Sequence, residues 1–177
     1  MDTPRLGDIT MMRLRLFRTG IVEKALDAAK DEGLQDPDMP DETADMEKIN
    51  TADDPADLID LCRKVKSYRG GDALVEKILA DQKNTMPILI EKFSRSLYDH
   101  FIDKAVLILA YCDEVYVDEV LKNYKNIRSD YAKCGLCVVL GYRNRKDCID
   151  FLKQEVKNLG RDEKYKTGPE VALEELM

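Results

Sequence analysis

The sequence predicts an all-α protein, built as an α-solenoid of about three stacked helical hairpins of the HEAT/ARM-like kind with capping helices at its ends. Two observations favour this fold class. From residue 55 onward, apolar residues recur at intervals of three and four, as they do on one face of a helix. The pattern of one helix pair also returns along the chain at a nearly constant offset, which is typical of helical repeats.

The segment 101–112, FIDKAVLILAYC, is expected to be the central buried helix. Its run from Ala105 to Cys112 is the most apolar of the chain, eight residues without a charge. Apolar residues occupy nearly every side of this predicted helix, so neighbouring helices should cover it on more than one side. Asp99 comes just before the segment and is expected to cap its first turn.

Residues 1–30 are predicted to form an N-terminal amphipathic helix, although the stretch 12–16 also alternates as a strand would. Arg13, Arg15 and Arg18 interrupt every apolar run there. No stretch of the chain approaches the ~18 uncharged apolar residues that cross a membrane. We therefore expect a cytoplasmic protein without a membrane span. The apolar stripe of this helix should dock on its own domain or on a neighbour's, which offers a route to a homo-oligomer.

Residues 31–54 are interpreted as an acidic linker, because they hold two prolines, many acids and no aromatic residue to bury. Between Asp31 and Asp57 there are eleven acidic residues and one lysine. This stretch has a net charge of −10 in a chain whose total is −7, so the remainder is at +3. The overall negative charge is therefore a weak argument against a nucleic-acid partner, because the folded part is nearly neutral to slightly basic.

Residues 55–177 are predicted to be a helical-repeat domain, in which each helix has a recognisable start or stop. Before the central helix we predict three helices: 56–68, opened by Asp54-Pro55 and ended by Gly70-Gly71; one capped by Asp72; and one starting at Asn84-Thr85 with Pro87 in its first turn. After the central helix we predict one starting at Asp113, one over 127–142 capped by Asn126 and one over 145–158 capped by Asn144. The last predicted helix, 169–176, is opened by a capping box from Thr167 to Glu170.

The repeat is visible in short matching segments. Leu109-Ala110-Tyr111 recurs as Leu140-Gly141-Tyr142 at an offset of 31 residues, and Leu109-Ala110 falls on Leu79-Ala80 at an offset of 30. These matches define helix pairs at roughly 72–96, 98–124 and 127–158. The segments 56–68 and 169–176 are then the capping helices. In such a stack Leu79, Leu109 and Leu140 are expected to occupy equivalent sites.

Ile127-Arg128 and Ala132, followed by Leu140-Gly141, resemble the short HEAT-like repeats of the bilin-lyase type. The resemblance covers about 90 of the 177 residues. It implies stacked helical hairpins, and it raises one alternative function, a lyase-like enzyme or enzyme accessory in which a cysteine or His100 takes part.

Residues for catalysis or metal binding do not occur at useful spacings. The five cysteines are expected to be buried free thiols, three of them on apolar faces of predicted helices. Cys134 and Cys137 form a CxxC pair without the second ligand pair that zinc needs. His100 is the only histidine and has no nucleophile at a recognisable spacing. We therefore expect no catalytic residue, no metal site and no cofactor.

The second helices of the predicted hairpins should line one continuous face. Its outward positions are Glu91, Lys122 and Lys153; Lys92, Asn123 and Gln154; and Arg95, Asn126 and Lys157. The predicted binding residues are Glu91, Lys92, Arg95, Lys122, Asn123, Lys153, Gln154 and Lys157.

This face predicts a non-catalytic protein–protein interaction module that presents one side of a short helical-repeat stack to a protein or peptide partner. The occupant could be an acidic peptide or the chain's own residues 31–54. Binding of nucleic acid is the alternative, but phosphate contacts need several cations on one face, and acidic residues interrupt these rows. A nucleic-acid partner is therefore not expected.

Overall fold

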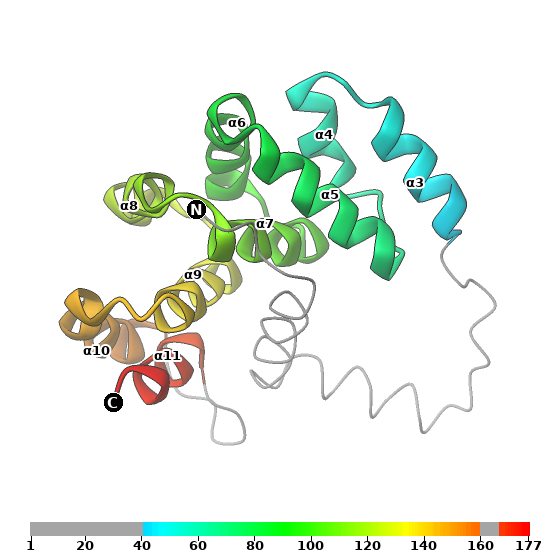
Figure 1. Cartoon of the computed structure of the whole chain (residues 1–177). Coiled ribbons are helices and arrows are strands. Elements are labelled where there is room, and N and C mark those ends of the chain that lie inside the picture. Colours follow the sequence, from blue (N-terminus) through cyan, green and yellow to red (C-terminus); the bar gives the residue numbers. More distant parts are fainter. Residues whose placement is uncertain (1–40, 160–166) are drawn as a thin grey trace, which may run out of the picture. The chain divides into compact units, whose positions relative to one another are not determined.

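The computed structural model describes residues 41–159 and 167–177, and this part of the chain is helical throughout, without a β-strand. The predicted all-α class is confirmed. The N-terminal helix expected over residues 1–30 lies outside the described residues. The described elements (Figure 1) are α3 (Glu42–Thr51), α4 (Pro55–Leu61), α5 (Tyr68–Ala80), α6 (Gln82–Arg95), α7 (Asp99–Tyr111), α8 (Glu114–Lys122), the 3-10 helix η1 (Tyr124–Asn126), α9 (Asp130–Tyr142), the 3-10 helix η2 (Lys146–Cys148), α10 (Ile149–Asn158) and α11 (Gly168–Leu176).

The described residues form two compact units, one of residues 41–133 and one of residues 134–159 with 167–177. The division therefore falls within α9, and not at the boundary between residues 54 and 55 that the acidic composition suggested. The first unit includes α3, because this helix contacts α5 and α4.

The predicted acidic linker has to be corrected over Glu42–Thr51, where the structure has the helix α3. Asp41 caps this helix by accepting a hydrogen bond from the amide of Ala44 at 3.0 Å. Ile49 is only 2% exposed, so a single aliphatic side chain anchors the helix. Acid-rich composition did not prevent helix formation here, because α3 has a side-chain cap and packs Ile49 against neighbouring helices.

Gly70 and Gly71 lie inside α5 and do not end a helix, which corrects the predicted stop at this position. The cap of α5 is Ser67 and not Asp72, because the Ser67 hydroxyl accepts a hydrogen bond from the Gly70 amide at 3.2 Å. A β-carbon on Gly70 would come within 2.5 Å of the Ser67 Oγ atom. The glycine is therefore needed for close packing around the cap.

The next helix, α6, starts at Gln82, three residues before the predicted start at Thr85. Pro87 consequently lies in the helix interior, where it cannot donate the usual backbone hydrogen bond. The hydroxyl of Thr85 is buried and donates to the carbonyl oxygens of Ile78 and Asp81 at 2.9 and 2.8 Å. These bonds join the end of α5 to the first turn of α6.

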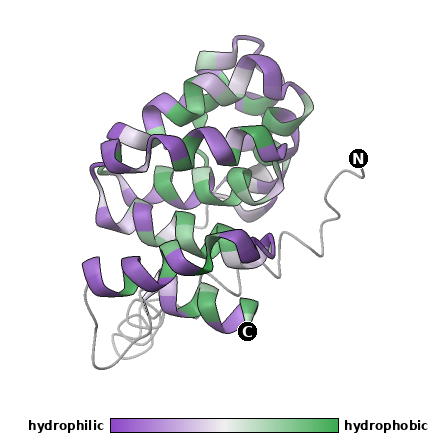
Figure 2. Ribbon diagram, turned by 90° about the vertical axis from the view of Figure 1, so that its left-hand side faces the viewer, coloured by the Kyte–Doolittle hydropathy of each residue, from purple (hydrophilic) through white to green (hydrophobic). Residues whose placement is uncertain are grey.

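The prediction of a central buried helix is confirmed by α7, in which eight of the 13 residues are buried. Its N-cap is Tyr98, so Asp99 is the first helical residue and not the cap. Figure 2 shows hydrophilic and hydrophobic residues alternating around the helices, the pattern of amphipathic helices that pack on one side.

The helices of the first unit contact one another in an alternating order. Helix α3 contacts α5 and α5 contacts α7, while α4 contacts α6 and α6 contacts α8 (Figure 1). Helices α5, α7 and α9 each have 13 residues and begin at residues 68, 99 and 130, at intervals of 31. At this interval the counterpart of Leu109 in α5 is Ile78. The expected counterpart was Leu79, because the sequence match between these two segments used an offset of 30 residues.

In the second unit, α9 and α11 approach closely. A β-carbon on Gly168 would lie 2.1 Å from the Cys134 carbonyl oxygen, and one on Gly141 would lie 2.6 Å from the α-carbon of Ala172. The predicted capping box is present at the start of α11, where Thr167 and Glu170 bond reciprocally.

Two predicted caps in this region were wrong. Asn126 belongs to η1, and α9 starts only at Asp130. Asn144 has a φ of 56°, a left-handed conformation that asparagine tolerates, and α10 starts only at Ile149.

Candidate functional site

Two hydrogen bonds hold the start of α8 and the chain that follows it against α6. At the start, the Asp113 amide donates to the Gln82 Oε1 atom at 2.7 Å. At the other end, the Arg128 amide donates to the Ser94 carbonyl oxygen at 3.0 Å. Gln82 and Ser94 are separated by about 18 Å of helix. The two helices therefore run in the same direction and frame a surface between them.

A hollow of about 520 Å³ lies along this surface. Its lining comes from α6, from the end of α8 and from the chain that follows, and it consists of Pro87, Ile90, Glu91, Ser94, Arg95, Glu119, Asn123, Asn126 and Arg128. A second hollow of about 330 Å³ shares Glu91 and Arg95 with the first and adds Arg63, Lys92 and Ser96. We call the two adjoining hollows the α6 groove.

Charges in the larger hollow are balanced. Two cations, Arg95 and Arg128, and two acids, Glu91 and Glu119, line it. The Arg95 guanidinium lies 2.9 Å from the Glu91 carboxylate in an exposed ion pair. Within the described residues, the guanidinium of Arg128 makes no hydrogen bond or ion pair. A balanced lining suits a ligand that carries both donors and acceptors, and it disfavours a polyanion.

Two asparagines add amide groups that donate and accept hydrogen bonds. The Asn123 Nδ2 atom donates to the Glu119 carbonyl oxygen at 3.0 Å, and this bond holds the asparagine at the end of α8. Asn126 is exposed three residues further on, in η1. A peptide backbone offers the complementary pattern of N–H and C=O groups.

One residue of the smaller hollow, Lys92, makes an ion pair with α4. The Lys92 ammonium lies 2.6 Å from the Asp60 carboxylate, and both side chains are partly exposed. This pair links α6 to α4. The Arg63 guanidinium stacks over the ring of Phe101, 5.5 Å from its centroid.

Of the eight predicted binding residues, the α6 groove contains Glu91, Lys92, Arg95 and Asn123. Lys122 is exposed and lines neither hollow. The remaining three are on α10, in the other compact unit. There Lys153 lies 3.8 Å from Asp150, Gln154 donates to Asn158 at 3.1 Å, and Lys157 is exposed.

Sequence reasoning missed Arg63 and Arg128 as parts of the site. The 31-residue interval contained no signal for Arg63, because it aligns Arg63 with Ser94, which is not one of the predicted outward positions. Arg128 had no signal either, since its place depends on the backbone bond to Ser94.

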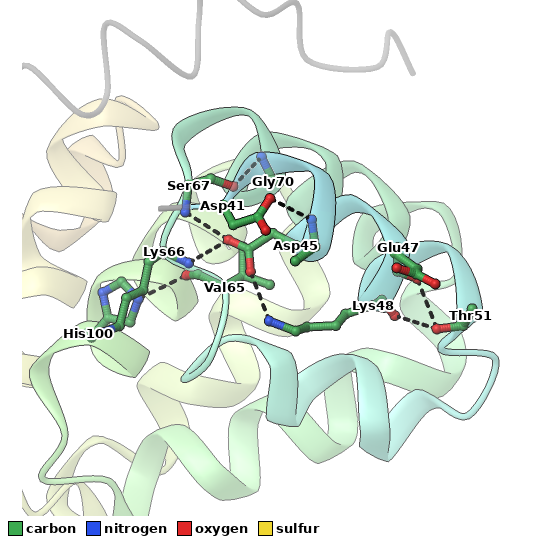
Figure 3. Close-up of polar contacts among 11 residues, drawn as sticks. Asp41, Asp45, Glu47, Lys48, Thr51, Val65, Lys66, Ser67, Gly70 and His100 are labelled. Carbon is green, nitrogen blue, oxygen red and sulfur yellow. Dashed lines mark hydrogen bonds and ion pairs between the residues drawn. The ribbon is translucent and has the colours of Figure 1, made fainter. Parts of the chain in front are cut away.

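The residues considered for catalysis have structural partners. His100 Nε2 is 3.0 Å from the Val65 carbonyl oxygen, so the ring joins the start of α7 to the chain between α4 and α5 (Figure 3). Burial raises the pKa of the Cys62 thiol to about 12, which disfavours its reactive thiolate. The five cysteines are free thiols, and only Cys134 is not fully buried.

Within residues 41–159 and 167–177, no three histidine, cysteine or carboxylate side chains are grouped so that they could hold a metal ion. No helix of that part of the chain combines the length and the apolar character needed to cross a bilayer. No family model, curated protein sequence or solved structure matches the chain.

Proposed function

We propose that the chain is a non-catalytic interaction module that binds an extended segment of a protein partner in the α6 groove. The observation that carries this proposal is the groove itself, with its balanced charges and with Asn123 and Asn126 beside it. An extended peptide can pair its backbone with such groups along α6.

The architecture we propose for this module is a short α-solenoid. The alternating order of helix contacts and the 31-residue interval between the starts of α5, α7 and α9 support it. Stacked hairpins place their second helices on a common face. Helices α4, α6 and α8 are the second helices under this proposal, and the α6 groove lies on the middle one.

The proposal is tested by selecting peptides from a random displayed library on the full chain and measuring their affinity by fluorescence anisotropy. Arg128→Glu is expected to weaken a selected peptide about tenfold or more, which corresponds to about 1.4 kcal/mol, because it changes the charge of the groove. Lys125→Glu is the matched control, since Lys125 is exposed three residues away and does not line the groove.

The control should change affinity by less than about twofold. Failure to select any peptide, or equal binding to the Arg128→Glu chain, would contradict the proposal. Circular dichroism of both variants checks that the helices are retained.

A further inference from the structure

The chain from the end of α4 to the first turn of α5 is strongly basic in an otherwise acidic protein. Residues 63–69 hold Arg63, Lys64, Lys66 and Arg69, and no acidic residue occurs between Asp60 and Asp72. We call this segment the basic loop. All four cations are exposed.

Helix α3 neutralises only part of this charge. The Arg69 guanidinium lies 3.3 Å from the Glu42 carboxylate. The Asp45 carboxylate accepts hydrogen bonds from the backbone amides at 66 and 67, and its ion pair is with Lys48 and not with a cation of the loop (Figure 3).

The side chains of Arg63, Lys64 and Lys66 therefore remain without an ion pair within the described residues. Arg63 is the one that also lines the smaller hollow of the α6 groove. Three cations in four residues thus face solvent at the groove's edge.

An exposed apolar pair lies next to these cations. Leu97 and Tyr98 are 73% and 53% exposed, in the connection between α6 and α7. Two contacts place the first turn of α7, which directly follows this connection, against the basic loop, since His100 bonds the Val65 carbonyl oxygen and Phe101 lies under Arg63. A contiguous exposed apolar patch rimmed by polar residues commonly marks a binding surface.

We propose that the basic loop and this apolar pair form the end of the α6 groove that selects an acidic peptide with an aliphatic or aromatic residue among its acids. This inference rests on the proposed function and names the class of partner. Arg63, Lys64 and Lys66 pair with the carboxylates of the peptide, and its apolar residue packs on Leu97 and Tyr98.

The groove favours a peptide over a nucleic acid or a lipid surface. A phosphodiester chain running from the basic loop along α6 would meet Glu91 and Glu119 within the groove. These carboxylates would repel its phosphates. A peptide can place its acidic side chains at the basic loop and its neutral backbone along the larger hollow of the α6 groove, where the charges are balanced.

The same displayed library tests this inference separately from the proposed function. Selected peptides should be enriched in aspartate and glutamate. Their affinity should fall about tenfold or more, about 1.4 kcal/mol, for the chain with Arg63→Glu, Lys64→Glu and Lys66→Glu. The double variant Lys64→Glu, Lys66→Glu keeps the Arg63 stack on Phe101 and should show most of this loss.

The matched control is the chain with Lys83→Glu, Lys122→Glu and Lys125→Glu, which has the same net charge and should stay within about threefold of the wild type. Leu97→Ser with Tyr98→Ser should weaken binding several-fold without changing the preference for acids. If neutral or basic peptides are selected, or if acidic peptides bind the triple basic-loop variant normally, the inference is wrong while the proposed function stands. If no peptide is selected, the proposed function fails first.

Two further probes decide between partner classes. A labelled oligothymidylate and vesicles of phosphatidylcholine with phosphatidylserine are tested for binding at matched salt. Neither should compete with the selected acidic peptide. Tighter binding of either probe, abolished by the basic-loop substitutions, would overturn the assignment to a peptide.

Discussion

At the scale of single residues, Asp45 is the least exposed of the described carboxylates. The residue is 4% exposed. Its carboxylate accepts hydrogen bonds from the Ser67 and Lys66 amides at 2.9 and 3.0 Å, as well as one from the Lys48 ammonium at 3.3 Å (Figure 3). Burial opposes ionisation, but these hydrogen bonds outweigh it, so the pKa of Asp45 is lowered. The charged form of this residue therefore stabilises the folded chain.

Asp45→Ala should lower the free energy of unfolding at neutral pH by about 1–3 kcal/mol, because it leaves two amides without their acceptor. The pKa is lower in the folded state than in the unfolded state. The stabilisation is therefore present above about pH 4 and is lost as pH falls through the folded pKa. Urea unfolding at several pH values measures the difference between the variant and the wild type.

Glu47→Ala is the control for this experiment, since Glu47 is exposed on the same helix. A difference between Asp45→Ala and the wild type that persists unchanged well below pH 4, or a Glu47→Ala effect of the same size, would contradict the role assigned to Asp45.

The reactivity of each cysteine depends on how deeply its own thiol is buried. Cys134 is the one cysteine that is not fully buried, whereas burial raises the pKa of Cys62 to about 12. Iodoacetamide should therefore label Cys134 first in the native chain and reach Cys62 only on unfolding. Peptide mass spectrometry over time measures the order, and equal rates at the two positions would refute it.

At the scale of elements, helix ends depend on contacts that lie far away in sequence. Gly70 and Gly71 are usual helix stops, yet α5 continues through them because Ser67 caps the helix and Asp45 holds the Ser67 amide. Helix α3 shows the same dependence. Its sequence has little apolar character, and one buried apolar residue, Ile49, packs it on its neighbours.

Gly168→Ala tests this dependence in α11. Helix propensity alone predicts a gain of about 1 kcal/mol for alanine in a helix. The structure predicts the opposite sign, a loss of about 1–3 kcal/mol, because the new β-carbon would lie 2.1 Å from the Cys134 carbonyl oxygen. Thermal unfolding followed by circular dichroism measures the change, and a stabilised variant would show that α11 does not pack this closely.

At the scale of the whole molecule, burial is uneven among the helices. Eight residues of α7 are buried, whereas α3 buries only Asp45 and Ile49. Local opening costs less free energy where few side chains are buried. Stability should therefore be highest around α7 and lowest in peripheral helices such as α3.

Native-state hydrogen exchange read by mass spectrometry measures this ranking. Amides in α7 should exchange more slowly than those in α3 by at least about tenfold, and the Asp45→Ala substitution should increase exchange in α3 without reaching α7. Equal protection of α3 and α7 would mean that the two helices open only together.

Much of the fold could be predicted because helical periodicity is a local property. The run from Ala105 to Cys112 is apolar on nearly every side, and α7 is buried as expected. Boundaries were less accurate wherever a cap depended on another helix, as at Ser67, or where proline entered a helix interior, as at Pro87. These details depend on tertiary contacts.

The candidate site was partly predictable for a related reason. Glu91, Lys92, Arg95 and Asn123 were predicted from the repeat interval and line the α6 groove. Lys122 was predicted by the same reasoning and does not line it. A repeat interval predicts which side chains of a helix point outward. It does not predict which of them line a hollow, because that depends on the neighbouring segments that form its walls.

The sequence by itself determined the helical class, the identity of the most buried helix and the approximate position of one polar face, because each follows from the spacing of apolar residues along a helix. Only the tertiary structure decided that an acid-rich segment contains α3 and that Arg63 and Arg128 border the same groove as α6. Those outcomes depend on hydrogen bonds and packing between residues distant in the chain, namely Asp45 with Ser67, Arg63 with Phe101 and Ser94 with Arg128.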